Sequence, residues 1–318
     1  VIPTGGKWIF ANINALNYFL HTAVPRYLTG TIFGNVTNIK QYIGEAYFLR
    51  ALEYFYRLRT LGDFPIVEKT LPVDSEVLTE ASKRMPRNEV ARFILSDLDN
   101  AIALTTNSPA KTRITKNAAL ILKSRVALFE ATWEKYHANT PLVPNGPGWP
   151  GAEKEYNKGY QFPAGSAQDE INFFLDQAME AASEVAEAIV LTSNNKTNPN
   201  NGSNPYYDMF ASHDPSEYPE VVMYREYSLA LSATHHFNHY MYSGGNTGYT
   251  AQFEKAFLLD NGLPWYADEN YYGKDDLIGD TKKNRDWRWQ LFMKAPNDVK
   301  ATANIATPEK FPNAPRLY

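Results

Sequence analysis

The chain has 318 residues, of which 44% are hydrophobic, 21% are charged and none is cysteine. This composition is ordinary for a folded protein with a sizeable core, and the lack of cysteine excludes disulfides and thiolate metal sites. The net charge of -4 argues against nucleic acid as a partner, and no apolar run has the length of a membrane-spanning helix.

Apolar residues recur every three or four positions in several segments, which predicts amphipathic helices. Pro86 and Thr115 stand where a helix is expected to start, and both residue types are favoured at that position. In chain order, the predicted helices cover residues 8–24, 39–61, 87–102, 115–136 and 167–189.

The second predicted helix is rich in aromatic residues and ends at a Gly-Asp-Phe-Pro corner. Its apolar positions occupy more than one side, which indicates a buried helix. Arg50 lies among them, and because an unpaired buried cation is costly, we expect Glu45 or Glu53 to hydrogen-bond it. Gly62 suits a C-terminal cap, and Pro65 prevents the helix from resuming.

The spacing of the helix starts is too irregular for a regular tetratricopeptide array, so periodicity alone predicts only antiparallel helical hairpins. Long stretches rich in Pro, Gly, Asn and Ser cover residues 140–168 and 193–220, and loops of this length are usually functional or disordered. The segment 221–231 begins with β-prone residues and is predicted to form a short strand.

Three blocks resemble the SusD/RagB family of bacterial surface nutrient-binding lipoproteins, in the order and approximate spacing of that family. They are YIGEAYFLRALEYF with LGDFPIV, then RMPRNEVARFILSDLDNAI, then RITKNAALILKSRVALFEATW. A weaker match continues through FEKAFLLDNGLPW and KNRDWRWQ. In the latter, we expect Arg285, Asp286 and Arg288 to form a local ion-pair network.

The resemblance implies a mainly α fold of degenerate tetratricopeptide-like helical hairpins, with long loops and a minor β element. It implies a single SusD-like domain over 1–318, incomplete at both ends, with a helical scaffold core in 1–139 and a loop-rich, ligand-facing region in 140–318. It also implies a cell-surface location at the outer membrane, through an N-terminal lipid anchor absent from this chain, and a SusC-like TonB-dependent porin as partner.

Trp149 lies between prolines and glycines in NGPGWPG, where a regular element cannot bury it. Its indole is either a stacking platform for a sugar, an anchor for a partner, or packed back onto the helix that carries Trp133. Aromatic rings suit sugars because a pyranose has an apolar face, while neighbouring polar side chains meet its hydroxyl groups.

The segment SATHHFNHYMYSGGNTGYT carries the other candidate ligand-binding residues, which are His235, His236, Tyr240, Tyr242 and Asn246. The histidines are metal ligands, ligand contacts or plain surface residues, and metal is the weakest of these interpretations because no carboxylate stands nearby. The tyrosines around three glycines either contact a glycan or form a structural loop.

The expected function is capture of an oligosaccharide and its delivery to the transporter, without catalysis and without a cofactor. No sequence motif of a serine hydrolase, zinc protease or phosphate-binding loop occurs, and no pair of acids is placed for glycoside hydrolysis. The alternative is a helical scaffold that binds a peptide or protein and no glycan.

Overall fold

The computed structural model describes residues 8–199, 201–228, 230–236, 248–271, 273, 276–298 and 310–312. The chain divides into two compact units, each described by itself. Unit 1 comprises Val1–Val190 with Pro219–Tyr224, and unit 2 comprises Leu191–Tyr218 with Arg225–Tyr318. The division at residue 139 that the sequence suggests, within a single domain, stays a prediction.

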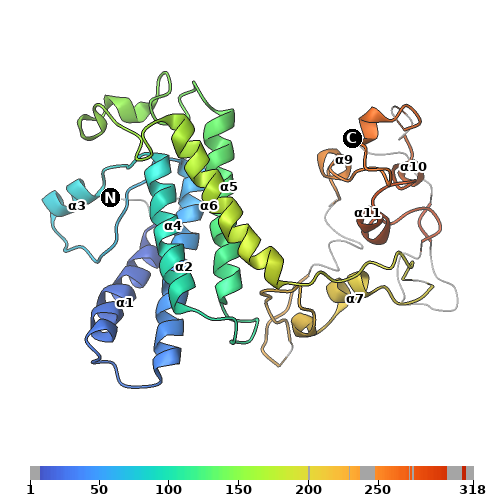
Figure 1. Cartoon of the computed structure of the whole chain (residues 1–318), viewed down its shortest axis with the longest axis horizontal. Helices are drawn as coiled ribbons and strands as arrows, with labels where there is room; N and C mark the ends of the chain where they lie inside the picture. Colours follow the sequence, from blue (N-terminus) through green and yellow to red (C-terminus); the bar gives the residue numbers. More distant parts are fainter. Residues whose placement is uncertain are drawn as a thin grey trace. The chain divides into compact units, whose positions relative to one another are not determined.

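Unit 1 is built from helices, and its long helices lie close to the predicted positions (Figure 1). The mainly α fold is therefore confirmed, with two short 3-10 turns in the loop before the last helix. In order, the elements are α1 Ala11–Leu28, α2 Val36–Leu61, α3 Ser75–Ala81, α4 Arg87–Leu104, α5 Lys116–Tyr136, η1 Pro150–Glu153, η2 Glu155–Asn157 and α6 Ala167–Ala188.

The ends of these helices are set by local signals in the sequence. The side chain of Thr115 accepts a hydrogen bond from the backbone of Ala118 and caps α5, as predicted. Pro86 is the residue that precedes α4. Gly62 ends α2 with a φ of 70°, a left-handed angle that favours glycine, and its N–H donates to the carbonyl of Leu58.

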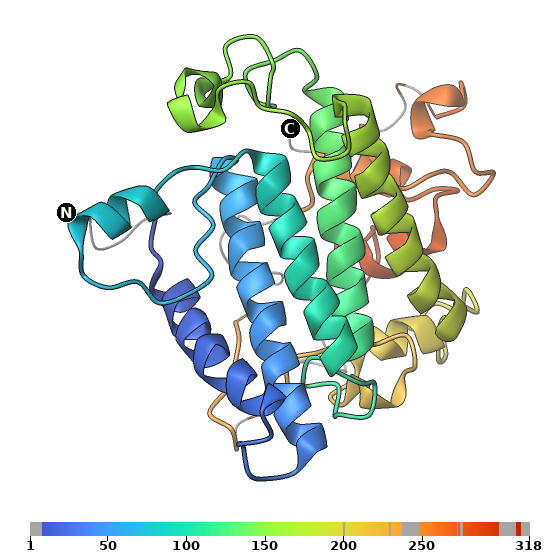
Figure 2. The same ribbon diagram turned by 60° about the vertical axis from the view of Figure 1, so that its left-hand side comes forward.

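The helices of unit 1 pack in chain order, with α1 against α2, α2 against α4, α4 against α5, and α5 against α6 (Figure 2). Their shared faces form one apolar core. Its most deeply buried large side chains are Ile13, Tyr54, Leu58, Phe64, Val90, Ile94, Leu98, Val126 and Phe174.

Three buried or half-buried arginines link neighbouring helices of unit 1 through paired hydrogen bonds to carboxylates. The pairs are Arg50–Asp97, Arg87–Glu130 and Arg92–Glu170. The prediction that Glu45 or Glu53 pairs with Arg50 is wrong.

The reason is that both glutamates bind other cations. Glu45 pairs with Arg113 and also accepts from Gln41, while Glu53 pairs with Arg57 one helical turn away. Arg50 instead faces α4, where Asp97 is the acceptor.

Unit 2 contains short elements joined by irregular chain. They are α7 Pro205–Ala211, η3 Pro215–Glu217, α9 Ala251–Lys255, η4 Trp265–Ala267, α10 Ile278–Thr281 and α11 Trp287–Phe292. Across the described residues, β pairing is limited to isolated bridges. The strand predicted over 221–231 is wrong, because among the described residues of this range only Ser228 pairs, with Ala233 across a tight turn.

Candidate functional site

Two residues of the segment around α11, Arg285 and Trp289, lie in the interior of unit 2. Arg285 is 2% exposed and donates to the carboxylate of Glu254 at 2.5 Å and to the carbonyl of Phe257 at 2.9 Å. Trp289 is 2% exposed, and its ring N–H donates to the carbonyl of Thr281. These contacts fix α11 in place.

Of the predicted ion-pair network of Arg285, Asp286 and Arg288, the pair of Asp286 with Arg288 is confirmed. Asp286 caps α11 and pairs with Arg288. Arg285 takes a different partner, Glu254, because its side chain turns inward rather than along the surface.

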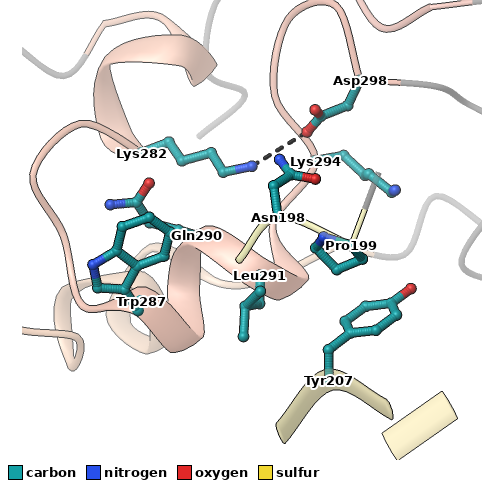
Figure 3. Close-up of a pocket in the computed structure, with 9 residues that line it drawn as sticks. All are labelled: Asn198, Pro199, Tyr207, Lys282, Trp287, Gln290, Leu291, Lys294 and Asp298. Carbon is teal, nitrogen blue, oxygen red and sulfur yellow. Dashed lines mark hydrogen bonds and ion pairs between the residues drawn. The ribbon is translucent and has the colours of Figure 1, made fainter. Parts of the chain in front are cut away.

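Three other residues of α11 line a pocket of about 170 Å³. Trp287, Gln290 and Leu291 are three and four residues apart and therefore share one face of the helix. Figure 3 shows Trp287 and Tyr207 on opposite sides of this pocket. The described residues that line it are Asn198, Pro199, Tyr207, Lys282, Trp287, Gln290, Leu291, Lys294 and Asp298.

The wall opposite α11 is shaped by Asn204, whose side chain is fully buried. Its oxygen caps α7 by accepting from the backbone of Tyr206 and Tyr207. Its amide donates to the side chain of Asn194 and to the carbonyl of Thr197. One amide group thus joins the start of α7 to the preceding loop, which supplies Asn198 and Pro199 to the pocket.

An aromatic cluster joins the two walls. Phe292, at the end of α11, stacks on Tyr207 with ring centroids 5.8 Å apart, and meets Phe210 edge to face at 5.1 Å. Tyr206 lies 6.3 Å from the same ring. Contacts of this kind add to the apolar burial that holds α7 against α11.

The polar end of the pocket is formed by Lys282 and Asp298. The ammonium of Lys282 lies 3.2 Å from the carboxylate of Asp298, and the same carboxylate oxygen accepts from the backbone of Ala295 at 2.9 Å. Lys294 follows the end of α11 and lines the same pocket. The pocket thus combines half-buried rings with amide and ammonium donors, an arrangement that can bind a ring with hydroxyl groups at its edge.

Chemistry beyond binding has no support in this pocket. Among the described residues of its lining, Asp298 is the one acid, whereas glycoside hydrolysis requires two carboxyl groups at a defined separation. Within the described ranges, no group of three or more His, Cys, Asp or Glu residues is arranged to hold a metal ion.

Trp149 lies in the interior of unit 1, 3% exposed. Its ring N–H donates to the carboxylate of Asp63 at 2.7 Å, at the corner that follows α2. A Cβ at Gly151 would lie 2.1 Å from the indole, so the neighbouring residue must be glycine. Of the alternatives in the sequence, the structure places the indole against the protein itself, with the corner after α2 as its polar contact.

The remaining predicted residues fall around the turn at 228–233. His235 and His236 are exposed, and the ring of His235 meets that of Tyr227 edge to face at 4.5 Å. The guanidinium carbon of Arg225 lies 5.1 Å from the centroid of the Tyr227 ring. Tyr240, Tyr242, Asn246 and the third histidine, His239, lie outside the described residues.

The residues of the pocket escaped prediction. Trp287 belongs to the KNRDWRWQ block, from which the sequence predicts an ion-pair network and no ligand contact. The usable signal was the spacing of Trp287, Gln290 and Leu291 on a short helix whose other tryptophan is core. Asn198 and Tyr207 carried no comparable pattern, because their approach to α11 depends on the fold.

Unit 1 has a separate apolar groove of about 360 Å³ beside the start of α1. Its walls come from α1, the chain after the Gly-Asp-Phe-Pro corner, and α3. The lining residues are Phe10, Ala11, Ile13, Asn14, Asn17, Pro65, Val67, Lys69, Leu71, Leu78, Ala81 and Ser82.

Unit 1 consists of helical hairpins that share a core, and unit 2 carries an aromatic and polar pocket, features that are compatible with a binding protein built on a helical scaffold. Residues 27–128 match the profile of the SusD-like family described as starch-binding and associating with the outer membrane. This match confirms the predicted family resemblance. The description names binding and no reaction, in agreement with the expectation of a protein that is not an enzyme.

The fold resembles that of a solved structure. A SusD-like protein from Bacteroides fragilis NCTC 9343 is 19% identical, with a TM-score of 0.51, over 85% of this chain and 46% of that one. A SusD-like carbohydrate-binding protein from the same organism is 17% identical, with a TM-score of 0.46, over 84% and 44% of the two chains.

A further similar structure was solved with xylogluco-oligosaccharide. It is 19% identical, with a TM-score of 0.41, over 67% of this chain and 34% of that chain. The present chain thus spans less than half the length of these three proteins. Comparison with curated proteins gave no match. Among the described helices, none has the length and apolar character needed to cross a membrane.

Proposed function

We propose that this protein binds oligosaccharides in the pocket of unit 2, at the outer membrane, and delivers them to a SusC-like TonB-dependent porin. The observation that carries the proposal is the face of α11, which presents Trp287 and Gln290 to a pocket closed by Tyr207. Flat rings contact the apolar face of a sugar, while amide and ammonium groups bind its hydroxyls. The description of the matching family as starch-binding supports the same class of ligand.

Weak binding suits a protein that must release its cargo. Burying an aromatic ring face contributes about 1.5–3 kcal/mol before the costs of association, so two rings are consistent with affinities from roughly micromolar to millimolar. His235, His236, Tyr240, Tyr242 and Asn246 remain proposed as further ligand contacts. The lipid anchor and the cell-surface location are likewise part of the proposal.

The test is a titration of the protein with a glycan panel that includes starch oligosaccharides and xylogluco-oligosaccharide. We expect saturable binding that weakens at least about 10-fold in Trp287→Ala, which corresponds to about 1.4 kcal/mol. Trp265→Ala is the matched control, because this tryptophan also belongs to unit 2 and is absent from the pocket lining. Binding that survives Trp287→Ala, or silence toward every glycan, would contradict the proposal.

Delivery requires its own experiment. We expect the full-length protein, isolated from its native membrane, to co-purify with a TonB-dependent porin. If the porin is absent from the purified material while glycan binding is intact, the result would contradict the proposed delivery and leave the proposed glycan capture standing.

A second candidate function is peptide binding, which the apolar groove of unit 1 favours. Apolar lining with few polar groups suits hydrophobic side chains better than sugar hydroxyls. Saturable binding of an apolar peptide that is weakened by Leu78→Asp in this groove, together with no response to glycans, would favour this function over the first.

A further inference from the structure

The pocket of unit 2 holds two ammonium groups and one carboxylate, and that carboxylate is already engaged. One oxygen of Asp298 accepts hydrogen bonds from both Lys282 and the backbone of Ala295. The negative charge of Asp298 therefore compensates Lys282, and both side chains are largely buried, with 21% and 16% exposure.

Lys294 differs from Lys282 because it has no such partner. Among the described residues, its ammonium makes neither a hydrogen bond nor an ion pair, although the side chain lines the same pocket. An uncompensated cation thus lines the same pocket as Trp287 and Gln290. A neutral sugar would make limited use of it, whereas a carboxylate or sulfate ester would form a charge-assisted hydrogen bond.

The neighbouring hollow extends this pattern. It has a volume of about 380 Å³ and shares Lys282 and Gln290 with the pocket, so the two hollows meet at these side chains. Its remaining charges are Lys283 and Asp280, whose ammonium and carboxylate lie 2.6 Å apart and compensate each other. Over both hollows, Lys294 is the cation left without a counter-charge in the described part of unit 2.

We propose that the ligand of this pocket is an anionic saccharide, whose carboxylate or sulfate group binds Lys294 while a sugar ring stacks on Trp287. The inference rests on the proposed function, since it names the class of glycan for the same site. Lys294 lines the pocket together with Trp287 and forms no ion pair with a described acid, so the pocket favours a negatively charged group on the sugar, whichever sugar carries it.

The experiment uses two matched pairs of glycans that differ only in charge. One pair is oligogalacturonate and its methyl ester, and the other is a carrageenan oligosaccharide and its desulfated form. Calorimetric titration of the whole chain should give affinities about 5- to 10-fold higher for at least one anionic member than for its neutral counterpart. The pair that shows the difference identifies the group as carboxylate or sulfate. The preference should shrink at high salt, because ions screen an exposed charge.

The variant Lys294→Gln should abolish the preference, because it lowers the affinity for the anionic member to that for the neutral member. Lys255→Gln, which removes the same charge from unit 2 outside the pocket, should keep the preference. Equal affinity for both members of each pair, or a preference that survives Lys294→Gln, would overturn the inference while leaving glycan binding in place. Failure of all glycans to bind would instead refute the proposed function.

Discussion

Arg50 on α2 and Asp97 on α4 form a two-pronged ion pair in the interior of unit 1. The guanidinium donates from Nε and Nη2 to the two carboxylate oxygens at 2.8 and 2.7 Å, and the side chains are 5% and 3% exposed. A third donor of Arg50 binds the side chain of Asn17 on α1. One arginine therefore joins three helices, and its charge is compensated where water is absent.

Loss of either partner should be strongly destabilising. We expect Asp97→Ala to lower the free energy of unfolding by about 3–5 kcal/mol, because the guanidinium of Arg50 would remain buried without a counter-charge. Chemical denaturation measures the change. The control is Asp99→Ala on the same helix, whose carboxylate is 56% exposed and pairs with Lys123, where a loss under about 1 kcal/mol is expected. Equal losses in the two variants would contradict this account.

Glu134 should make the protein less stable as the pH rises. It is buried, and its two carboxylate oxygens have no hydrogen-bond partner among the described residues. Burial raises the pKa of Glu134 from its ordinary value of 4.5 to about 9, and the nearby charges of Glu130 and Glu170 act in the same direction. Between these values the unfolded chain has lost the proton and the folded chain keeps it, so each pH unit costs about 1.4 kcal/mol of stability.

The isosteric variant Glu134→Gln should remove this dependence. We expect it to unfold at a higher temperature than the wild type at pH 8 and at a similar temperature near pH 4, where both states of the wild type are protonated. Thermal unfolding followed at several pH values measures the difference. An unchanged difference between the two proteins across this range would show that Glu134 does not hold its proton.

Trp149 should contribute to stability through its contact with Asp63. We expect Trp149→Ala to cost about 3–5 kcal/mol of unfolding free energy, since it empties a buried site. Trp149→Phe should cost less, because it keeps most of the apolar burial and loses the hydrogen bond to the carboxylate. Both variants should keep the glycan affinity of the pocket in unit 2. A variant with unchanged stability and lost glycan binding would restore the platform interpretation of the sequence.

The helices were predictable because their signals are local. Pro86, Thr115 and Gly62 act on residues within one turn, and the apolar spacing between them needs no knowledge of the partner helix. The partner of Arg50 lies 47 residues away, and several acids in the chain could have satisfied it. Packing of α2 on α4 selected Asp97, and that choice leaves no trace in the spacing of charges.

The site was harder to predict for a related reason. Proline and glycine around Trp149 exclude a regular element, which suggests exposure, yet Asp63 from 86 residues earlier provides a buried acceptor. Conversely, Trp287 is two residues away from Trp289, which is buried. Residues two apart on a helix point to different sides, and the packing of the helix decides which of the two indoles faces inward. The walls of the pocket come from segments that only the folded chain brings together.

In and next to α11, the residues that anchor the helix differ from the residues that line the pocket. Arg285 and Trp289 secure the helix from within, whereas Trp287, Gln290 and Lys294 meet the pocket. Substitutions at Trp287, Gln290 or Lys294 change the surface of the pocket without touching the anchoring contacts. These positions are therefore the natural choice for laboratory selection of new ligand specificities.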